Sequence, residues 1–445
     1  MEKPAARVLE ANRTQLEWRP VDLEGLLPAD HRARAVWTFV EQLDLGPLYE
    51  RIQAVEGVAG RPAIDPRILV ALWLHATLEG VGSARALERL CEEHHAYRWI
   101  CGGVGVNHHT LSDFRVVHVE FLDGLLTQSV AALLASGTVR MNRVAQDGVR
   151  VRAHAGAASF RRRPRLEQYL DEAQAQVAAL KREVDADPGA SNRRQQAARV
   201  RAARERKDRV GRALHELRKI EARRKKTAQA KQTRQEPPSG GAEKPAPAKK
   251  QRDKAPRAST TDPEARVMKG ADGGFRPSYN VQLATDVETQ CVVAVDVSNL
   301  GTDQGLLEPM LEQLRQRYGR CPSEMLVDGG FATVDGIQAT AEANSQLYAP
   351  VKPPKNPKND PYRPRRSDSP PVAEWRARMA TAAAKEIYKQ RAATAECVNA
   401  QARNRGLRQF RVRGMLKAKA VVLWHALAHN LSRMMNPNPR VALVV

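Results

Sequence analysis

The sequence predicts an α/β protein in which a mixed β-sheet follows an N-terminal helical domain and is interrupted by a long helical insertion. Three observations predict this class. Helix caps and apolar residues at helical spacing run through residues 1–140, apolar and polar residues alternate as in a strand over 141–153, and a highly charged helical pattern fills 161–260. With 445 residues the chain has room for two or three domains. We expect an N-terminal domain (1–140), a first strand (141–160), the insertion (161–260), the rest of the sheet domain (261–414) and a C-terminal helix (415–445).

The N-terminal domain is predicted from signals that start helices. Asp65 followed by Pro66 is typical of an N-cap with proline at the first helical position, and Ser83 predicts the start of another helix. Thr110–Asp113 resembles a capping box at the start of a third helix, which carries Arg115. Two short helices before a capped third are consistent with a helix-turn-helix in which Arg115 faces DNA. A plain helical bundle with a solvated arginine is the alternative.

The insertion is predicted as an antiparallel helical hairpin with a coiled-coil seam. Apolar residues at a 4-3-4-3-4 spacing indicate the seam, a turn follows at 185–192, and a second helix follows the turn. Residues 237–256 are too polar to pack and are predicted to be disordered. The seam residues are Leu166, Leu170, Ala173, Val177, Leu180 and Val184.

Charge is concentrated in this insertion. It holds 29 Lys and Arg against 13 Asp and Glu, which is a surplus of 16 out of the net charge of +22 for the whole chain. A contact with the phosphate backbone of nucleic acid, or a dimerisation arm, explains this concentration better than simple solvation.

Strands resume after the insertion, in an order that predicts a mixed sheet covered by helices. The expected elements are a hairpin of strands at 278–283 and 291–297, a helix at 304–318, a strand at 324–328, a helix at 334–344, a strand at 347–351, a linker at 352–371, and helices at 376–403 and 417–434.

Composition points to a polyanionic partner. Lys and Arg number 72 against 50 Asp and Glu, and nucleic acid is the usual partner of such a surplus. No apolar run approaches the roughly 18–20 residues that a membrane span needs, so no membrane partner is expected. The first twenty residues lack the apolar segment of a secretory signal, and the five scattered cysteines suggest a reducing compartment. We therefore expect a cytoplasmic protein. Cys91 and Cys101 have histidines nearby, but their spacing fits no standard zinc pair.

Three carboxylates are candidates for one catalytic site. Asp147 lies in the first strand beside Gly148, Asp328 ends a short apolar strand, and Glu396 lies on a late helix. Three such carboxylates suit two Mg²⁺ ions that promote an in-line phosphoryl transfer. Other roles remain open at this stage: a turn residue for Asp147, a helix cap for Asp328, and an ordinary surface residue for Glu396, since Glu386 precedes it by ten positions.

The residues around these carboxylates resemble the DDE transposases of bacterial insertion sequences, and most closely the IS1182 group within the broader IS5/IS4-like transposases. The resemblance runs in order over nearly the whole chain, and Phe114-Arg115 matches the end of the family's N-terminal helical domain. The motifs that carry it are Gln146–Ala153, Ser278–Gln282, Leu326–Phe331, Tyr388–Glu396 with Arg403, and Phe410–Gly414.

The resemblance implies an RNase H-like catalytic core that uses two Mg²⁺ ions, with Mn²⁺ as a substitute. The implied metal ligands and catalytic residues are Asp147, Asp328 and Glu396. The residues implied to touch phosphates of the terminal DNA are Tyr388, Arg391 and Arg403. Two departures from the family's pattern stand out. Arg403 replaces the usual lysine, which changes the geometry of the charge, and Cys397-Val-Asn-Ala stands where relatives more often have Pro-Val-Phe-Gly.

The expected function is that of a transposase that binds the terminal inverted repeats of its element, cuts the DNA ends and joins them to target DNA. Because two ends must be held together, a homodimer is expected in the DNA complex, at the nucleoid of the bacterial cytoplasm. A catalytically inactive, transposase-derived DNA-binding protein is the alternative, and an unrelated Mg²⁺ nuclease is a third hypothesis.

Overall fold

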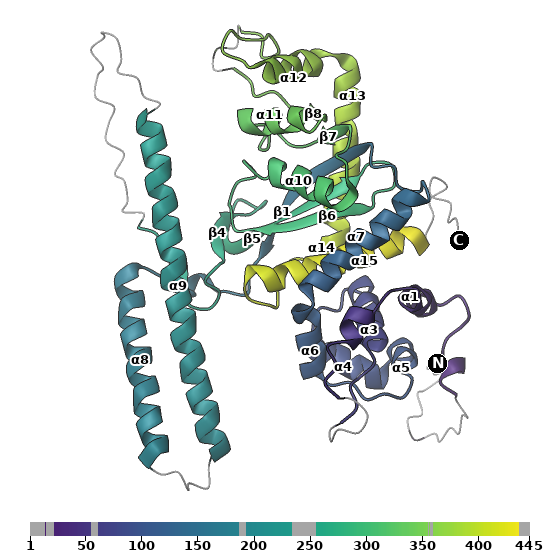
Figure 1. The fold of residues 1–445 in the computed structure, drawn as a ribbon, viewed down its shortest axis with the longest axis vertical. Helices are drawn as coiled ribbons and strands as arrows, with labels where there is room; N and C mark the ends of the chain where they lie inside the picture. The colour runs from purple at the N-terminus through teal and green to yellow at the C-terminus, as the bar shows by residue number, and fades with distance from the viewer. Residues whose placement is uncertain are drawn as a thin grey trace, which may run out of the picture.

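The computed structural model describes residues 22–54, 61–186, 193–233, 255–354 and 359–435, together with Thr14 and Asn356. A mixed sheet lies at the centre, the N-terminal helices pack at one end of it, and two long helices extend to one side (Figure 1). The stretch 237–256, predicted to be disordered, lies outside the described residues except for its last two positions.

The N-terminal region is helical, as predicted. Asp65 caps its helix by accepting a hydrogen bond from the Arg67 backbone N–H at 2.8 Å, and Ser83 caps the next helix. The prediction of a capping box at Thr110 is wrong, because Asn107 caps the third helix and Thr110 lies in its first turn. The elements are η1 (Glu24–Leu26), α1 (Arg32–Glu41), α2 (Gly46–Tyr49), α3 (Pro66–Leu78), α4 (Ala84–Glu93), α5 (His95–Cys101), α6 (His108–Val117) and α7 (Val119–Ala135).

The predicted mixed sheet is present. Its neighbouring strands are β6, β5, β1, β7 and β8 in that order, and β4 pairs with the other end of the long strand β5. Strand β1 is antiparallel to β5 and parallel to β7, and β7 is parallel to β8. The strands are β1 (Arg143–Arg152), β4 (Arg266–Lys269), β5 (Phe275–Asp286), β6 (Val292–Ser298), β7 (Glu324–Leu326) and β8 (Gln346–Tyr348).

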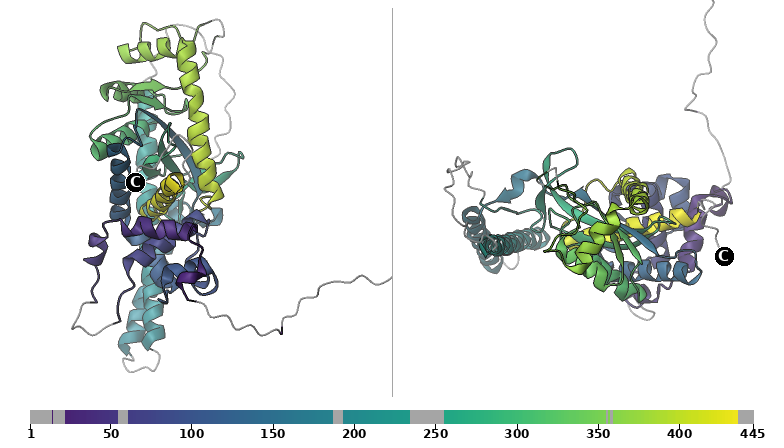
Figure 2. Two further views of the ribbon diagram at one scale, coloured as in Figure 1. Left: turned by 90° about the vertical axis from the view of Figure 1, so that its right-hand side faces the viewer. Right: turned by 90° about the horizontal axis from the view of Figure 1, so that it is seen from above.

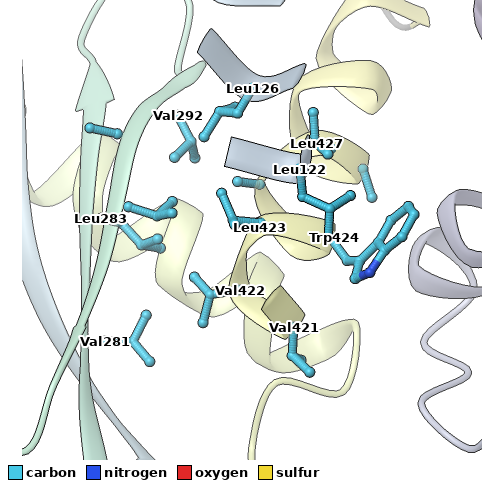
Figure 3. Packing of buried hydrophobic residues seen from close by; sticks show 14 of the residues in the cluster. Leu122, Leu126, Val281, Leu283, Val292, Val421, Val422, Leu423, Trp424 and Leu427 are labelled. Carbon is cyan, nitrogen blue, oxygen red and sulfur yellow. The ribbon is translucent and has the colours of Figure 1, made fainter. Parts of the chain in front are cut away.

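The C-terminal helix α15 (Met415–Met435) joins the sheet to the N-terminal helices. Figure 3 shows Val422 and Leu423 of α15 among apolar residues of β5, β6 and α7. The indole N–H of Trp424 donates to the Arg115 carbonyl of α6 at 3.0 Å. The amide of Asn430 bonds both backbone groups of Val292 in β6, at 2.8 Å each. One continuous apolar core therefore includes the sheet and the N-terminal helices.

The insertion forms the predicted helical hairpin. Helices α8 (Arg163–Ala186) and α9 (Arg193–Thr233) lie side by side and stand to one side of the sheet in Figures 1 and 2. At its base, the short strands β2 (Phe160–Arg161) and β3 (Ala258–Ser259) pair with each other. A small apolar cluster, separate from the main core, holds the hairpin together; its buried members are Leu166, Val210, Ala213, Leu214, Leu217 and Ala258.

The single long helix predicted over 376–403 is interrupted twice. Thr381 has an extended backbone (ψ 148°) and caps the next helix by accepting from the Ala384 N–H. A π-helical turn, η3 (Ala392–Glu396), then separates two α-helical segments. The helices of this half of the chain are α10 (Leu307–Tyr318), α11 (Val334–Glu342), α12 (Pro370–Ala380), α13 (Ala382–Arg391) and α14 (Cys397–Asn404).

Among the described residues, no single helix has both the length and the apolar content to cross a membrane. Only α6 and α7 together meet these two criteria, as a pair bent by 64°.

Candidate active site

Asp147 lies in β1, and Asp328 lies two residues after the end of β7, the parallel strand beside it. The two aspartates occupy matching positions in the register of these strands. Ala145 of β1 pairs with Leu326 of β7, and each aspartate follows its strand partner by two residues. Because adjacent strands lie about 4.7–4.9 Å apart, this register brings both aspartates to the same place at the edge of the sheet. Asp147 lies within β1, which continues to Arg152, so it is not a turn residue.

The carboxylate of Asp147 is held by two side chains from the helices that cover it. Asn399 of α14 donates its amide to Oδ2 at 2.8 Å, and Arg391 at the end of α13 donates to Oδ1 at 3.1 Å. Burial raises the pKa of Asp147, and the Arg391 guanidinium opposes this rise. The negative charge of Asp328 raises the pKa of Asp147 further, as expected for two carboxylates that share a site.

Glu396 is linked to Asp147 through Arg391. The guanidinium that binds Asp147 also donates to Glu396 Oε1 at 3.3 Å, and the Glu396 side chain is 63% exposed. Glu396 ends the π-helical turn η3, and such turns inside helices are frequent at functional sites. The competing Glu386 instead pairs with the exposed Lys389 on the surface of α13. The structure therefore connects Glu396, and not Glu386, to Asp147.

Tyr388 lies on α13, one helical turn before Arg391. Its half-buried hydroxyl has a raised pKa, first because of burial. Arg391 lowers this pKa, whereas the charges of Asp328, Asp147 and Glu396 all raise it. Tyr388 is therefore within electrostatic reach of all three carboxylates.

Asp328 is positioned by its own loop. Its Oδ1 accepts a hydrogen bond from the Gly330 N–H at 2.7 Å. A Cβ atom at Gly330 would come within 2.8 Å of that oxygen, so only glycine fits there without moving the carboxylate. The cap of α11 is Thr333, which accepts from the Gly336 N–H at 3.0 Å. The helix-cap alternative for Asp328 is therefore wrong.

A polar network behind β1 was missed by the sequence patterns. Asp303, in the loop between β6 and α10, accepts hydrogen bonds from Asn280 at 2.8 Å and from Gln282 and Arg150 at 3.0 Å. A Cβ atom at Gly148 would lie 2.4 Å from Asp303 Oδ1, so this glycine marks the close approach of the network to β1. The charge of Asp303 is a further cause of the raised pKa of Asp147. Strand alternation predicts neither the loop position nor the partners of Asp303.

A basic groove adjoins Gly148 on this edge of the sheet. It is open, has a volume of about 500 Å³, and is lined in part by Arg403 of α14. The acids in its wall, Asp272 and Asp303, are paired with Arg276 and Arg150. The remaining basic residues of the wall make no ion pair within the described part of the chain; they are Arg152, Lys269, Arg403 and Arg408.

The exposed position predicted for Arg115 on a recognition helix is wrong. The residue is only 9% exposed, and its guanidinium donates to the Gly82 carbonyl at 2.8 Å. The same group lies over the Trp73 ring, 4.7 Å from its centroid. Helical spacing alone does not reveal that α4 and α15 cover this face of α6.

The carboxylate oxygens of this site are of the kind that binds a hard divalent cation. Carboxylate oxygens are the ligands that Mg²⁺ prefers, and the repulsion between Asp147 and Asp328 is what such a cation relieves. In this conformation Arg391 supplies the positive charge between Asp147 and Glu396. No three His, Cys, Asp or Glu side chains of the described residues form a ready metal site.

Two family models match the chain, one before and one after the strands of the sheet. One, described as Transposase domain (DUF772), matches residues 21–116, which cover the N-terminal helices through Arg115. The other, described as Transposase DDE domain, matches residues 355–435, which include Tyr388, Arg391, Glu396 and Arg403. No curated protein and no solved structure gives a match. Together the two matches support the assignment of the chain as an insertion-sequence DDE transposase.

Proposed function

We propose that this transposase binds the terminal inverted repeats of its element and carries out Mg²⁺-dependent cleavage and transfer of DNA strands, within the IS1182 group. The observation that carries the proposal is the matching register of Asp147 and Asp328 on adjacent parallel strands. Arg391 connects Asp147 to Glu396, and the charges of all three carboxylates raise the pKa of Tyr388.

The strand order supports an RNase H-like core. The meander of β1, β5 and β6 is antiparallel, and the two later strands β7 and β8 add in parallel on the other side of β1. This arrangement places the first aspartate in the central strand and the second beside it. The third carboxylate comes from a helix that covers the same face.

The metal ligands in this proposal are Asp147, Asp328 and Glu396, with Mg²⁺ as the native ion and Mn²⁺ as a substitute. When bound, the two ions activate the attacking hydroxyl and stabilise the leaving oxygen. Arg391 pairs with both Asp147 and Glu396. Because a guanidinium binds phosphate as well as carboxylate, a DNA phosphate would compete with Glu396 for Arg391 and leave the Glu396 carboxylate available as a metal ligand.

The basic groove beside Gly148 is the proposed path of the terminal DNA. Arg403 and Arg408 carry charge there without an ionic partner among the described residues, and Arg403 lies two helical turns beyond Glu396. Contacts between arginines and phosphates position the DNA backbone but do not read the base sequence. Double-stranded DNA of the element and of the target is the proposed partner, at the bacterial nucleoid, and two chains assemble as a homodimer on a pair of ends.

The Asp328→Asn variant tests the proposal. The substrate is a plasmid that carries the DNA flanking this reading frame on both sides, incubated with Mg²⁺. Loss of a metal ligand removes several kcal/mol of stabilisation, so nicking should fall about a thousandfold or more while binding to the flanking DNA stays unchanged. The matched control is Asp335→Asn, which removes an exposed carboxylate from the first turn of α11 and should leave nicking intact.

Three outcomes contradict parts of this proposal. An equal loss of DNA binding in Asp328→Asn would argue against a metal role for that residue. Absence of nicking by the unaltered chain would favour the catalytically inactive DNA-binding protein. Nicking without preference for the flanking DNA would favour an unrelated nuclease.

A further inference from the structure

An open cleft of about 350 Å³ lies between the N-terminal helices and the sheet domain, apart from the carboxylates. The first turns of α4 and α6, both ten-residue helices, form one side. The start of a helix carries partial positive charge and binds anions. All ionisable side chains that line this described cleft are basic: Arg85, His108, His109, Arg115, His154 and Arg411.

The arginines of the cleft are not neutralised by any acid of the described residues. Arg85 and Arg411 are exposed and make no ion pair with any described residue. The nearby Glu88 is engaged by His108, whose ring nitrogen lies 2.9 Å from Glu88 Oε2 and whose backbone N–H donates to Oε1 at 3.0 Å. The negative charge of Glu88 is therefore used by His108, and Arg85 and Arg411 can bind an anion.

Arg115 lies in the floor of the cleft with an incomplete set of partners. One of its terminal nitrogens donates to Gly82, but its Nε is buried and has no hydrogen-bond partner among the described residues. Burial, and then the charge of Arg411, lower the pKa of Arg115 to about 10. A buried guanidinium without a counter-ion is costly, and an anion in the cleft would offset that cost.

The loop that follows α14 connects the cleft with the basic groove beside Gly148. Arg403 and Arg408 line the groove, and Arg411 lines the cleft. The loop is hydrogen-bonded to the end of β1: the Arg152 N–H donates to the Arg408 carbonyl at 3.1 Å, and the Arg152 carbonyl accepts from the Phe410 N–H at 2.8 Å. Basic side chains thus continue from this groove to the N-terminal helices along one segment that is bonded to β1.

We propose that this cleft is a phosphate-binding site that holds a backbone phosphate of the DNA bound at the active site, so that one DNA molecule contacts both the DDE domain and the N-terminal helices. Arg85 and Arg411 bind the phosphate oxygens, and Arg115 supplies charge from below. That the ligand is DNA rests on the proposed function. That the cleft binds an anion rests on its own geometry and charge.

The test is metal-free DNA binding by the full chain, measured by fluorescence anisotropy with a labelled duplex of the flanking DNA between 50 and 200 mM salt. Loss of one phosphate contact should weaken binding several-fold and make the slope of log K against log salt shallower by about 1 for Arg85→Ala and for Arg411→Ala. The matched control is Arg98→Ala, which removes an exposed arginine of α5 that does not line the cleft. Equal slopes for the cleft variants and the control would overturn the proposal.

A second measurement separates DNA from a free anion. Inorganic phosphate should stabilise the chain against heat only weakly at constant ionic strength, and the salt slope with DNA should depend on Arg411. Strong stabilisation by inorganic phosphate that Arg411→Ala removes, with an unchanged DNA slope, would assign the cleft to a small anion and overturn the DNA assignment. Because no cleavage is measured, this result is independent of the Asp328→Asn test.

Discussion

Asn399 shows how one amide orients the carboxylate of Asp147, a proposed metal ligand. It is 4% exposed and donates to Asp147 Oδ2, and its own carbonyl oxygen is buried without a partner among the described residues. It stands in the segment where resembling transposases more often have Pro-Val-Phe-Gly, so this chain departs from the pattern at the residue that touches Asp147. With Arg391 on the other oxygen, the carboxylate has one fixed orientation. Hydrogen bonds from neighbouring side chains hold a metal-binding carboxylate in the orientation that the metal requires.

Replacing this amide by an apolar side chain of similar size should weaken the metal site. Asn399→Leu should lower Mg²⁺-dependent cleavage about 10–100-fold, as is usual for partners of metal ligands, and raising the Mg²⁺ concentration should recover part of the loss. The measurement is the rate of nicking as a function of Mg²⁺. Gln401→Leu is the control, because this amide of the same helix donates a hydrogen bond to Cys397 and not to Asp147. An unchanged Mg²⁺ dependence in a folded Asn399→Leu variant would contradict the role of Asn399.

At the scale of elements, local patterns predicted most of the sheet and its order. The strand at 324–328 and the hairpin at 278–297 agree with β7, β5 and β6 to within a few residues, because alternation and flanking glycines encode them locally. The interruption at Thr381 and the π-helical turn before Glu396 were not predicted, since alanine-rich helical sequence continues through both. They arise from packing over the sheet, which also places Arg391 between two carboxylates. The candidate aspartates were therefore predictable, whereas the partners that orient them were not.

The helical hairpin of α8 and α9 is an element whose role follows from its packing. Of the predicted seam residues, Leu166, Ala173 and Leu180 are buried where α8 lies beside α9 of the same chain, so these three are not free to pair with a second copy. The other three, Leu170, Val177 and Val184, are half-buried. Most Lys and Arg side chains of α8 and α9 in the described part of the hairpin are exposed. This arrangement favours the phosphate-contact hypothesis over dimerisation through the seam.

Removing the hairpin should distinguish a role in phosphate contact from a role in dimerisation. Strands β2 and β3 already bring Arg161 and Ala258 together, so a short Gly/Ser linker can replace residues 162–257. The shortened chain should remain folded, although Arg266 loses Glu216, and its DNA binding should show a shallower salt slope by several units. The measurements are anisotropy over a salt series and size-exclusion chromatography of the DNA complex. An unchanged slope would favour simple solvation, and a loss of the dimer would favour a dimerisation arm.

At the scale of the whole molecule, α15 joins parts that the sequence divides into separate domains. Its apolar residues belong to the same core as the sheet and the N-terminal helices, whereas the hairpin has its own small cluster. The proposed DNA path follows the same division, because the groove and the cleft both lie on the part that α15 holds rigid. Changes in composition along the sequence predicted the hairpin. They did not predict that α15 connects the sheet with the N-terminal helices, because contacts between distant segments leave no local pattern.

This division predicts two unfolding transitions of different origin. Trp424 is buried on the side of α15 that faces the N-terminal helices, where it bonds α6, and truncation of such a side chain costs about 3–5 kcal/mol, so Trp424→Ala should lower the main transition by about 5–10 °C. Leu214→Ala, in the cluster of the hairpin, should lower only the smaller transition. Differential scanning calorimetry of the full chain and of the chain without the hairpin checks this assignment, since the smaller transition should be absent from the shortened chain. If Trp424→Ala instead split the main transition in two, the N-terminal helices and the sheet would unfold independently, and a rigid connection between the cleft and the active site would not hold.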